Sequence, residues 1–87
     1  MKEFTLEDAK RIGAILNIDW QKFLPEQFMI GLNVELEHGT RDSFTNVTND
    51  DDVMTGKIAL AHLNEFPDYY ERLEKLEEEA NVFWGAH

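Results

Sequence analysis

The length of the chain constrains its fold most, because 87 residues can bury only one hydrophobic core. A chain of this size buries roughly 60% of the surface that its unfolded form exposes. No disulfide can support that core, since cysteine is absent, and thiolate metal ligands and thiol nucleophiles are excluded for the same reason. Hydrophobic residues make up 43% of the chain and charged residues 30%, a balance that favours a globular fold over disorder. We therefore expect a single domain over residues 1–87.

The charge of the chain is strongly negative, since 18 acidic and 8 basic side chains give a formal net charge of −10. This charge argues against direct binding of nucleic acid or of a membrane surface, and it favours cations or a basic protein partner. No apolar stretch approaches the roughly 20 residues of a membrane-spanning helix. Residues 1–8 also lack the apolar run of a secretion signal. The expected location is the cytoplasm.

The first helix signal lies near the N-terminus. Thr5 and Asp8 have the spacing of a capping box, and the apolar stripe that follows predicts a helix over residues 6–16. A short turn is expected over residues 20–24, where aromatic side chains favour burial.

The segment over residues 25–38 fits two kinds of secondary structure. Pro25 suits the first position of a helix, and Gly39 stands where a left-handed C-cap belongs. Residues 32–37 also alternate between apolar and polar side chains, as an edge strand does. We favour the helix, because large apolar residues recur at four-residue steps along the segment.

Two further helices are expected in the second half of the chain. Residues 40–52 are rich in Thr, Asn and Asp and predict a surface loop. A helix over residues 53–66 follows, which Pro67 ends, and a last helix runs over residues 69–82. The pattern predicts an all-α fold, a small single-domain bundle of four to five short helices.

Helical spacing also predicts which faces point inward. The expected inner side of the helix over residues 53–66 consists of Met54, Ile58, Ala61, His62 and Glu65. For the last helix it consists of Tyr70, Leu73, Leu76 and Ala80. Phe83 and Trp84 are expected to fold back onto the core, because two adjacent exposed aromatic residues on a small protein promote association.

Two glutamate–histidine pairs are the candidate site. Glu35 and His38 are three residues apart, as are His62 and Glu65, so each pair projects from one side of a helix. Bundle proteins hold divalent iron or manganese with similar Glu/His sets on facing helices. The hypothesis is a divalent-metal site formed by Glu35, His38, His62 and Glu65, with further groups expected from Glu37, Tyr70 and Glu77. Nothing in the sequence selects a reaction, so no enzymatic activity is predicted.

Three other interpretations compete with a metal site. His38 can interact with the C-terminal end of a helix dipole while His62 is a partly buried residue bonded to Glu35 or Tyr70. The chain can instead be a protein–protein interaction module, such as a phage-type inhibitor whose acidic surface mimics nucleic acid. The third interpretation is a homodimer closed by Phe83 and Trp84.

Two stretches of sequence prompt a family resemblance. They are Val34-Glu35-Leu36-Glu37-His38-Gly39 and the longer stretch from Lys57 to Tyr70, which contains Ala61-His62-Leu63-Asn64-Glu65-Phe66-Pro67-Asp68-Tyr69-Tyr70. Together they resemble a family of short bacterial and phage proteins that are grouped as a domain of unknown function. The resemblance covers about residues 28–78 and implies a small helical fold, without a known activity or cofactor.

Overall fold

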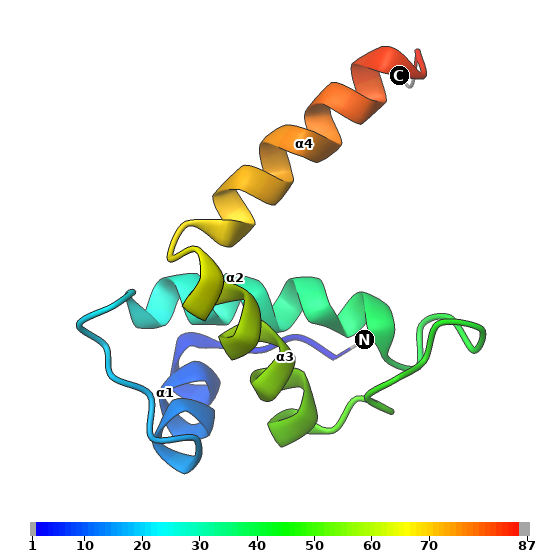
Figure 1. Cartoon of the computed structure of the whole chain (residues 1–87). Helices are drawn as coiled ribbons and strands as arrows, with labels where there is room; N and C mark the ends of the chain where they lie inside the picture. Colours follow the sequence, from blue (N-terminus) through cyan, green and yellow to red (C-terminus); the bar gives the residue numbers. More distant parts are fainter. Residues whose placement is uncertain (1, 86–87) are drawn as a thin grey trace.

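The computed structural model describes residues 2–85, and this part of the chain is helical without any strand. Over these residues there are four α-helices and one short 3₁₀ helix, η1 (Figure 1): α1 Leu6–Ile15, α2 Pro25–Glu35, η1 Leu36–His38, α3 Asp52–Glu65 and α4 Tyr69–Phe83. The all-α prediction is confirmed, and residues 32–37 are helical rather than extended.

Local hydrogen bonds define both ends of α1. The Thr5 hydroxyl accepts from the Asp8 amide, and the Asp8 carboxylate accepts from the Thr5 amide, which is the predicted capping box. At the other end Asn17 is left-handed, with φ of 57°. Its amide donates to the carbonyl of Ala14 and the next amide donates to Gly13, so the helix ends in a Schellman motif. Residues 20–22 form a turn, within the range 20–24 where a short turn was expected.

The end of α2 differs from the prediction for Gly39. This glycine has φ of −102° and ψ of −145°, so it is not a left-handed C-cap. The chain tightens into η1 instead, and the Asp50 carboxylate accepts from the Thr40 amide at 2.9 Å and from its hydroxyl at 2.6 Å. These two bonds hold the loop that leads to α3 against the end of η1.

The core lies where α1, α2 and α3 pack against one another. Phe28 and Leu32 of α2 are completely buried between Ile12 of α1 and Ala59 of α3. A glycine permits this packing, because a Cβ added to Gly56 of α3 lies only 2.7 Å from the Ile12 side chain. The buried apolar residues are Phe4, Ala9, Ile12, Phe23, Phe28, Leu32, Leu36, Ala59, Leu63 and Tyr70.

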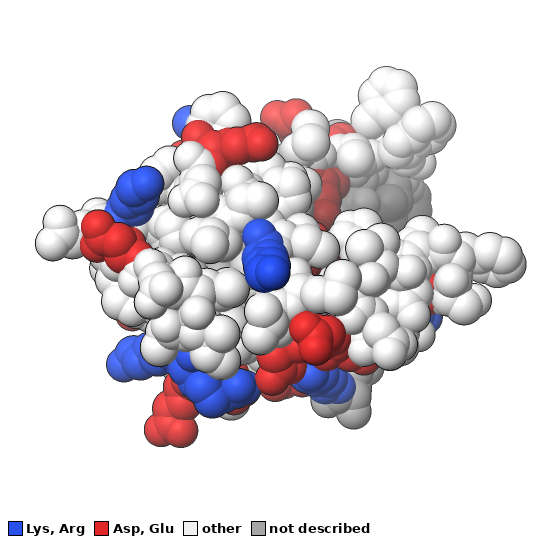
Figure 2. Space-filling view, turned by 60° about the horizontal axis from the view of Figure 1, so that its bottom comes forward, with Lys and Arg blue, Asp and Glu red and all other residues white. Residues whose placement is uncertain are grey.

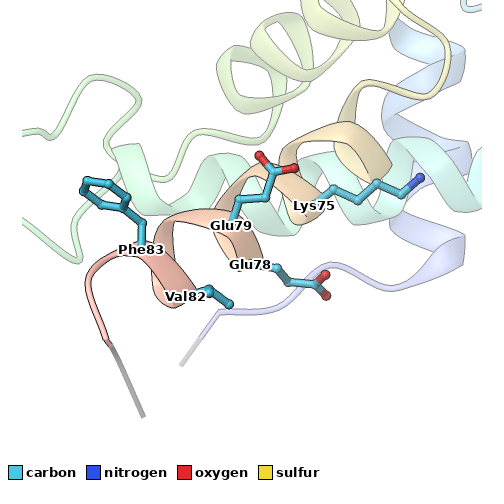
Figure 3. A pocket seen from close by; sticks show the side chains of 5 residues that line it. All are labelled: Lys75, Glu78, Glu79, Val82 and Phe83. Carbon is cyan, nitrogen blue, oxygen red and sulfur yellow. The ribbon is translucent and has the colours of Figure 1, made fainter.

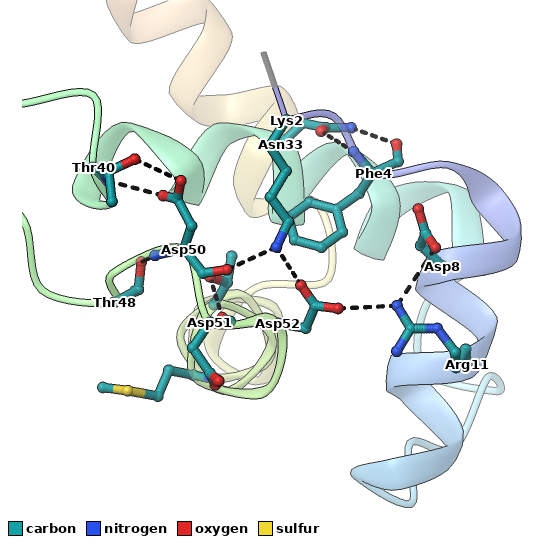
Figure 4. Close-up of polar contacts among 12 residues, drawn as sticks. Lys2, Phe4, Asp8, Arg11, Asn33, Thr40, Thr48, Asp50, Asp51 and Asp52 are labelled. Carbon is teal, nitrogen blue, oxygen red and sulfur yellow. Dashed lines mark hydrogen bonds and ion pairs between the residues drawn. The ribbon is translucent and has the colours of Figure 1, made fainter.

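Polar contacts attach the N-terminal segment to this bundle (Figure 4). The Asn33 side chain accepts from the Phe4 amide at 2.7 Å and donates to the Phe4 carbonyl at 3.0 Å. Asp52, at the start of α3, forms ion pairs with Lys2 at 2.5 Å and with Arg11 at 3.0 Å. The hydrogen bond from Lys2, followed by that from Arg11, lowers the pKa of Asp52. Asp52 therefore serves as a structural ion-pair partner for both basic residues.

The inner face of α3 is rotated from the predicted one. The buried residues are Thr55, Gly56, Ala59 and Leu63, whereas Met54, Ala61 and Glu65 are exposed. The prediction was wrong because helical spacing shows which residues share a face but not which face packs inward. The helices approach closely enough that small residues occupy the interface.

The last helix leaves the bundle instead of packing along it. In Figure 1, α4 projects away from the other three α-helices, and the molecule extends 41 × 30 × 20 Å. Tyr70 is buried and Leu73 partly buried, but Leu76 and Ala80 are exposed, against the prediction. Phe83 and Trp84 do not fold back. The cause is the connection to α3, where Phe66 is extended and directs the chain outward.

Charges of both signs are interspersed on the face of the molecule that Figure 2 shows, where acidic and basic side chains alternate around uncharged surface. The excess of negative charge is therefore not gathered into one patch on this face. None of the helices between residues 2 and 85 is both long and apolar enough to cross a membrane.

An aromatic residue of the core and one at the outer end of α4 are expected to contribute differently to the free energy of unfolding. Phe28→Ala should lower the free energy of unfolding by about 3–5 kcal/mol, because it leaves a cavity among completely buried side chains. Phe83→Ala should change it by no more than about 0.5 kcal/mol. Urea unfolding at low protein concentration, followed by far-UV circular dichroism, measures both. Equal losses in the two variants would contradict the described position of α4.

Candidate functional site

A buried carboxylate joins α2 to α4. Glu35 is the last residue of α2 and is only 4% exposed. Its Oε2 atom accepts a hydrogen bond of 2.7 Å from the hydroxyl of Tyr70, in the first turn of α4. A carboxylate in such surroundings requires a donor, since burial without one costs several kcal/mol. The Tyr70 hydroxyl supplies it from 35 residues further along the chain.

A histidine from α3 completes this cluster. The Nε2 atom of His62 lies 3.9 Å from the Glu35 Oε2 atom, and one third of the His62 side chain is exposed. The imidazole stacks on Tyr69, with ring centroids 4.3 Å apart and planes 7° from parallel. Three helices therefore meet at Glu35, His62, Tyr69 and Tyr70, which we call the Glu35 cluster.

A glycine provides the space for Tyr70. Gly31 lies one turn before Glu35 on α2, and a Cβ added to it lies 2.5 Å from the Tyr70 ring. The ring can therefore rest against the helix backbone while its hydroxyl reaches Glu35. Only glycine leaves enough room at position 31 for this arrangement.

The environment of Tyr70 favours its neutral form. Burial raises the pKa of the Tyr70 phenol well above its ordinary value of 10.0, and the hydrogen bond to the Glu35 carboxylate raises it further. The phenol is therefore a fixed hydrogen-bond donor and not a base or a nucleophile. The cluster holds three helices together, and His62 is its partly exposed member.

Two of the four predicted metal ligands lie together and two lie elsewhere. Glu35 and His62 form the contact just described. His38 is exposed on η1, and its main-chain carbonyl accepts from the amides of Val47 and Thr48. Glu65 is exposed at the end of α3. Between residues 2 and 85, no group of three or more His, Cys, Asp or Glu side chains is arranged to hold a metal ion.

The other side chains proposed to assist a metal also lie in different parts of the structure. Glu37 is exposed on η1, while Tyr70 belongs to the Glu35 cluster. Glu77 borders a groove that Tyr70 also lines. The sequence interpretation overlooked Gly31 and Tyr69. The signal for Gly31 was its position one helical turn before Glu35, on the same side of α2.

A second feature is an apolar stripe along α4. Its members are separated by steps of four and three residues, and we call them the α4 stripe: Tyr69, Leu73, Leu76, Ala80 and Phe83. The stripe is partly covered by the bundle at Tyr69 and Leu73 and exposed beyond them. Leu76 is 60% exposed and Phe83 is 78% exposed.

Two shallow grooves accompany the stripe. One lies at the outer end of α4 and is shown in Figure 3, where it is lined by Lys75, Glu78, Glu79, Val82 and Phe83. The other lies at the base of the helix and has a largely apolar lining of Phe66, Tyr69, Arg72, Leu73 and Leu76. The Arg72 guanidinium lies over the Phe66 ring, 4.7 Å from its centroid, and pairs with Asp68.

The fold and these two features define a small all-α protein with a projecting C-terminal helix. A family described as "Protein of unknown function (DUF5661)" matches residues 9–79, and the chain belongs to this family. The match begins well before residue 28, where the resemblance in the sequence was first apparent. Comparisons with curated proteins and with solved structures give no match. A bacterial or phage origin stays a prediction.

Stability at alkaline pH should depend on Tyr70. Because its folded-state pKa lies above the unfolded value of 10.0, its contribution to the free energy of unfolding is complete below that pH and is lost as the pH rises further. Urea unfolding from roughly pH 8 to roughly pH 11 should show this decline. Tyr70→Phe should lose about 1–3 kcal/mol near neutral pH, since Glu35 then lacks its donor, and should decline less above pH 10. Parallel pH profiles for the two proteins would refute this role.

Proposed function

We propose that this protein is a protein–protein interaction module that binds its partner through α4. The observation that carries the proposal is the exposure of the outer half of this helix. Leu76, Val82 and Phe83 of this 15-residue helix and Trp84 directly after it are all at least 60% exposed. Single exposed apolar residues are ordinary on a protein surface, but a contiguous group of this size is typical of an interaction site.

The Glu35 cluster supports the same function, because it fixes the base of α4. Tyr70 is held by Glu35, and Tyr69 stacks on His62, so the first turn of α4 is attached to both α2 and α3. A helix anchored in this way presents its apolar side chains in a defined direction. Preorganisation of this kind lowers the entropy that is lost when a partner binds.

The charge of α4 restricts the partner. The helix carries five glutamates and only two basic residues, Arg72 and Lys75. A partner surface that places basic side chains opposite some of these glutamates, beside an apolar strip, complements it. A phage-type inhibitor that mimics nucleic acid is one form of this proposal. In that case Glu74, Glu78 and Glu79 contact the basic groove of the partner.

A divalent-metal site is a second candidate function. It is favoured by one contact, the 3.9 Å approach of the His62 Nε2 atom to the Glu35 Oε2 atom. These two donors alone are too few for a structural site, which in most metalloproteins has at least three protein ligands. Glu35 is also already bonded to Tyr70. A bound ion therefore requires ligands from solvent, or from His38 and Glu65 after rearrangement.

Photo-cross-linking tests the interaction function. A benzophenone amino acid placed at position 83 should form protein adducts in an extract of the cells that produce the protein, whereas the same group at Lys10 of α1 should not. Lys10 is a matched control, because it is equally accessible to solvent by class but belongs to a different helix, α1. Leu76→Ser should remove the adducts formed from position 83. Equal adduct yields from the two positions would overturn the proposal.

Elemental analysis tests the metal candidate. Protein purified without chelator should contain near-stoichiometric metal if the site exists, and His62→Ala should contain at least about tenfold less, since a main ligand is removed. His38→Ala distinguishes a pair from the full four-residue set, because its metal content falls only if His38 is a ligand. Metal contents below about one tenth of an ion per chain in all three proteins would reject the candidate.

A further inference from the structure

We propose that the partner is a second copy of this chain, and that the two α4 helices pair antiparallel about a two-fold axis. This inference rests on the proposed function of α4 and names the surface that it binds. The first argument is the spacing of the α4 stripe. Its steps of four, three, four and three residues average 3.5, the period of a left-handed helix pair with interlocking side chains. The outer part of this stripe does not cover the core of its own chain, because Leu76, Ala80 and Phe83 are exposed.

The sizes of the side chains specify the antiparallel direction. When Leu73 of one copy lies opposite Leu76 of the other, the same register places Tyr69 opposite Ala80. The largest residue of the stripe, at its inner end, then faces the smallest, and the two copies fill the space between them without a void. A parallel pair instead stacks Ala80 on Ala80 and Tyr69 on Tyr69, which leaves a gap at one level and crowding at another.

The groove at the base of α4 receives the outer end of the second helix. In the antiparallel register, Phe83 of one copy reaches past Tyr69 of the other, toward the groove at the base of α4. Phe66 lines the largely apolar groove that also includes Tyr69, Leu73 and Leu76. Each copy therefore offers both the exposed aromatic residue and the groove that fits it. An interface of two identical, self-complementary patches has this property.

Charge complementarity supports the same register. Arg72 and Glu79 lie on one edge of the stripe, seven residues apart. Antiparallel pairing places Arg72 of each copy beside Glu79 of the other, so the two-fold axis produces two equivalent ion pairs. Arg72 is available for this contact because 61% of its side chain is exposed while it pairs with Asp68. The positions directed away from the seam include Glu71 and Glu78, where negative charge does not oppose association.

A charge-swap experiment tests the pairing. Sedimentation equilibrium of the full chain, at the roughly 0.15 M ionic strength where distant charges are screened, should show a dimer of the 10.2 kDa chain whose population rises with concentration. Glu79→Arg should raise the dimer dissociation constant by about tenfold, because two attractive pairs become repulsive. Glu78→Arg is the matched control, since it changes the net charge equally, and it should shift the constant by less than about twofold.

The double variant identifies the direction of the helices. Arg72→Glu combined with Glu79→Arg restores both ion pairs only in the antiparallel register, so its dissociation constant should return to within about threefold of the parent value. Circular dichroism of each variant confirms that the helices persist. A parent chain that stays monomeric at the highest soluble concentration would overturn the proposal, as would equal effects of Glu79→Arg and Glu78→Arg.

Cross-linking separates this proposal from the proposed function. Purified protein with the benzophenone group at position 83 should form an adduct of twice the chain mass, with the cross-link on residues that line the groove at the base of α4. An adduct of another mass in the cell extract, with none in the purified protein, retains the interaction function and overturns the second copy as partner. No adduct in either sample overturns both.

Discussion

The hydrogen bond from Tyr70 to Glu35 is the contact on which the arrangement of the last helix depends. It is a buried polar bond between α2 and α4, and its acceptor is a carboxylate that has little access to water. Gly31 makes it possible by leaving room for the phenol ring. His62 and Tyr69 add a stacked pair beside it, so the first turn of α4 is fixed to two helices at once. Leu73 then extends the contact by one turn, and the remaining helix stands free of the bundle.

This attachment divides α4 into a structural half and an exposed half. The first half contributes Tyr70 to the core, whereas the second half contributes no buried residue. The bundle of α1, α2 and α3 has its own apolar core and its own polar connections, from the α1 capping box to the ion pairs of Asp52. The apolar residues at the outer end of α4 therefore have no part in the core of the chain itself. A role in association explains their presence, because exposed apolar surface lowers the free energy of a complex when it is buried.

The sequence predicted the candidate site only as far as the spacing of residues along one helix determines it. Glu35 and His62 were selected for their spacing from His38 and Glu65, and the structure brings the first two together and leaves the other two on the surface. Spacing along one helix identifies side chains that share a face, but it does not show which face packs inward. For α3 the inner face holds Gly56 and Ala59, which allow close approach, together with Leu63. The partner of Glu35 proved to be Tyr70, which lies 35 residues away.

The sequence by itself determined the all-α class and the approximate limits of the helices, because these depend on signals between near neighbours. The Thr5–Asp8 capping box and Pro25 at a helix start are such signals, and so is the polar loop before α3. Tertiary structure alone decided that α4 leaves the bundle and that Phe83 and Trp84 remain exposed. An amphipathic helix has the same pattern whether its apolar stripe faces its own core or another molecule. The anchoring of Tyr70 to Glu35 distinguishes these cases, and it is a contact between residues distant in the sequence.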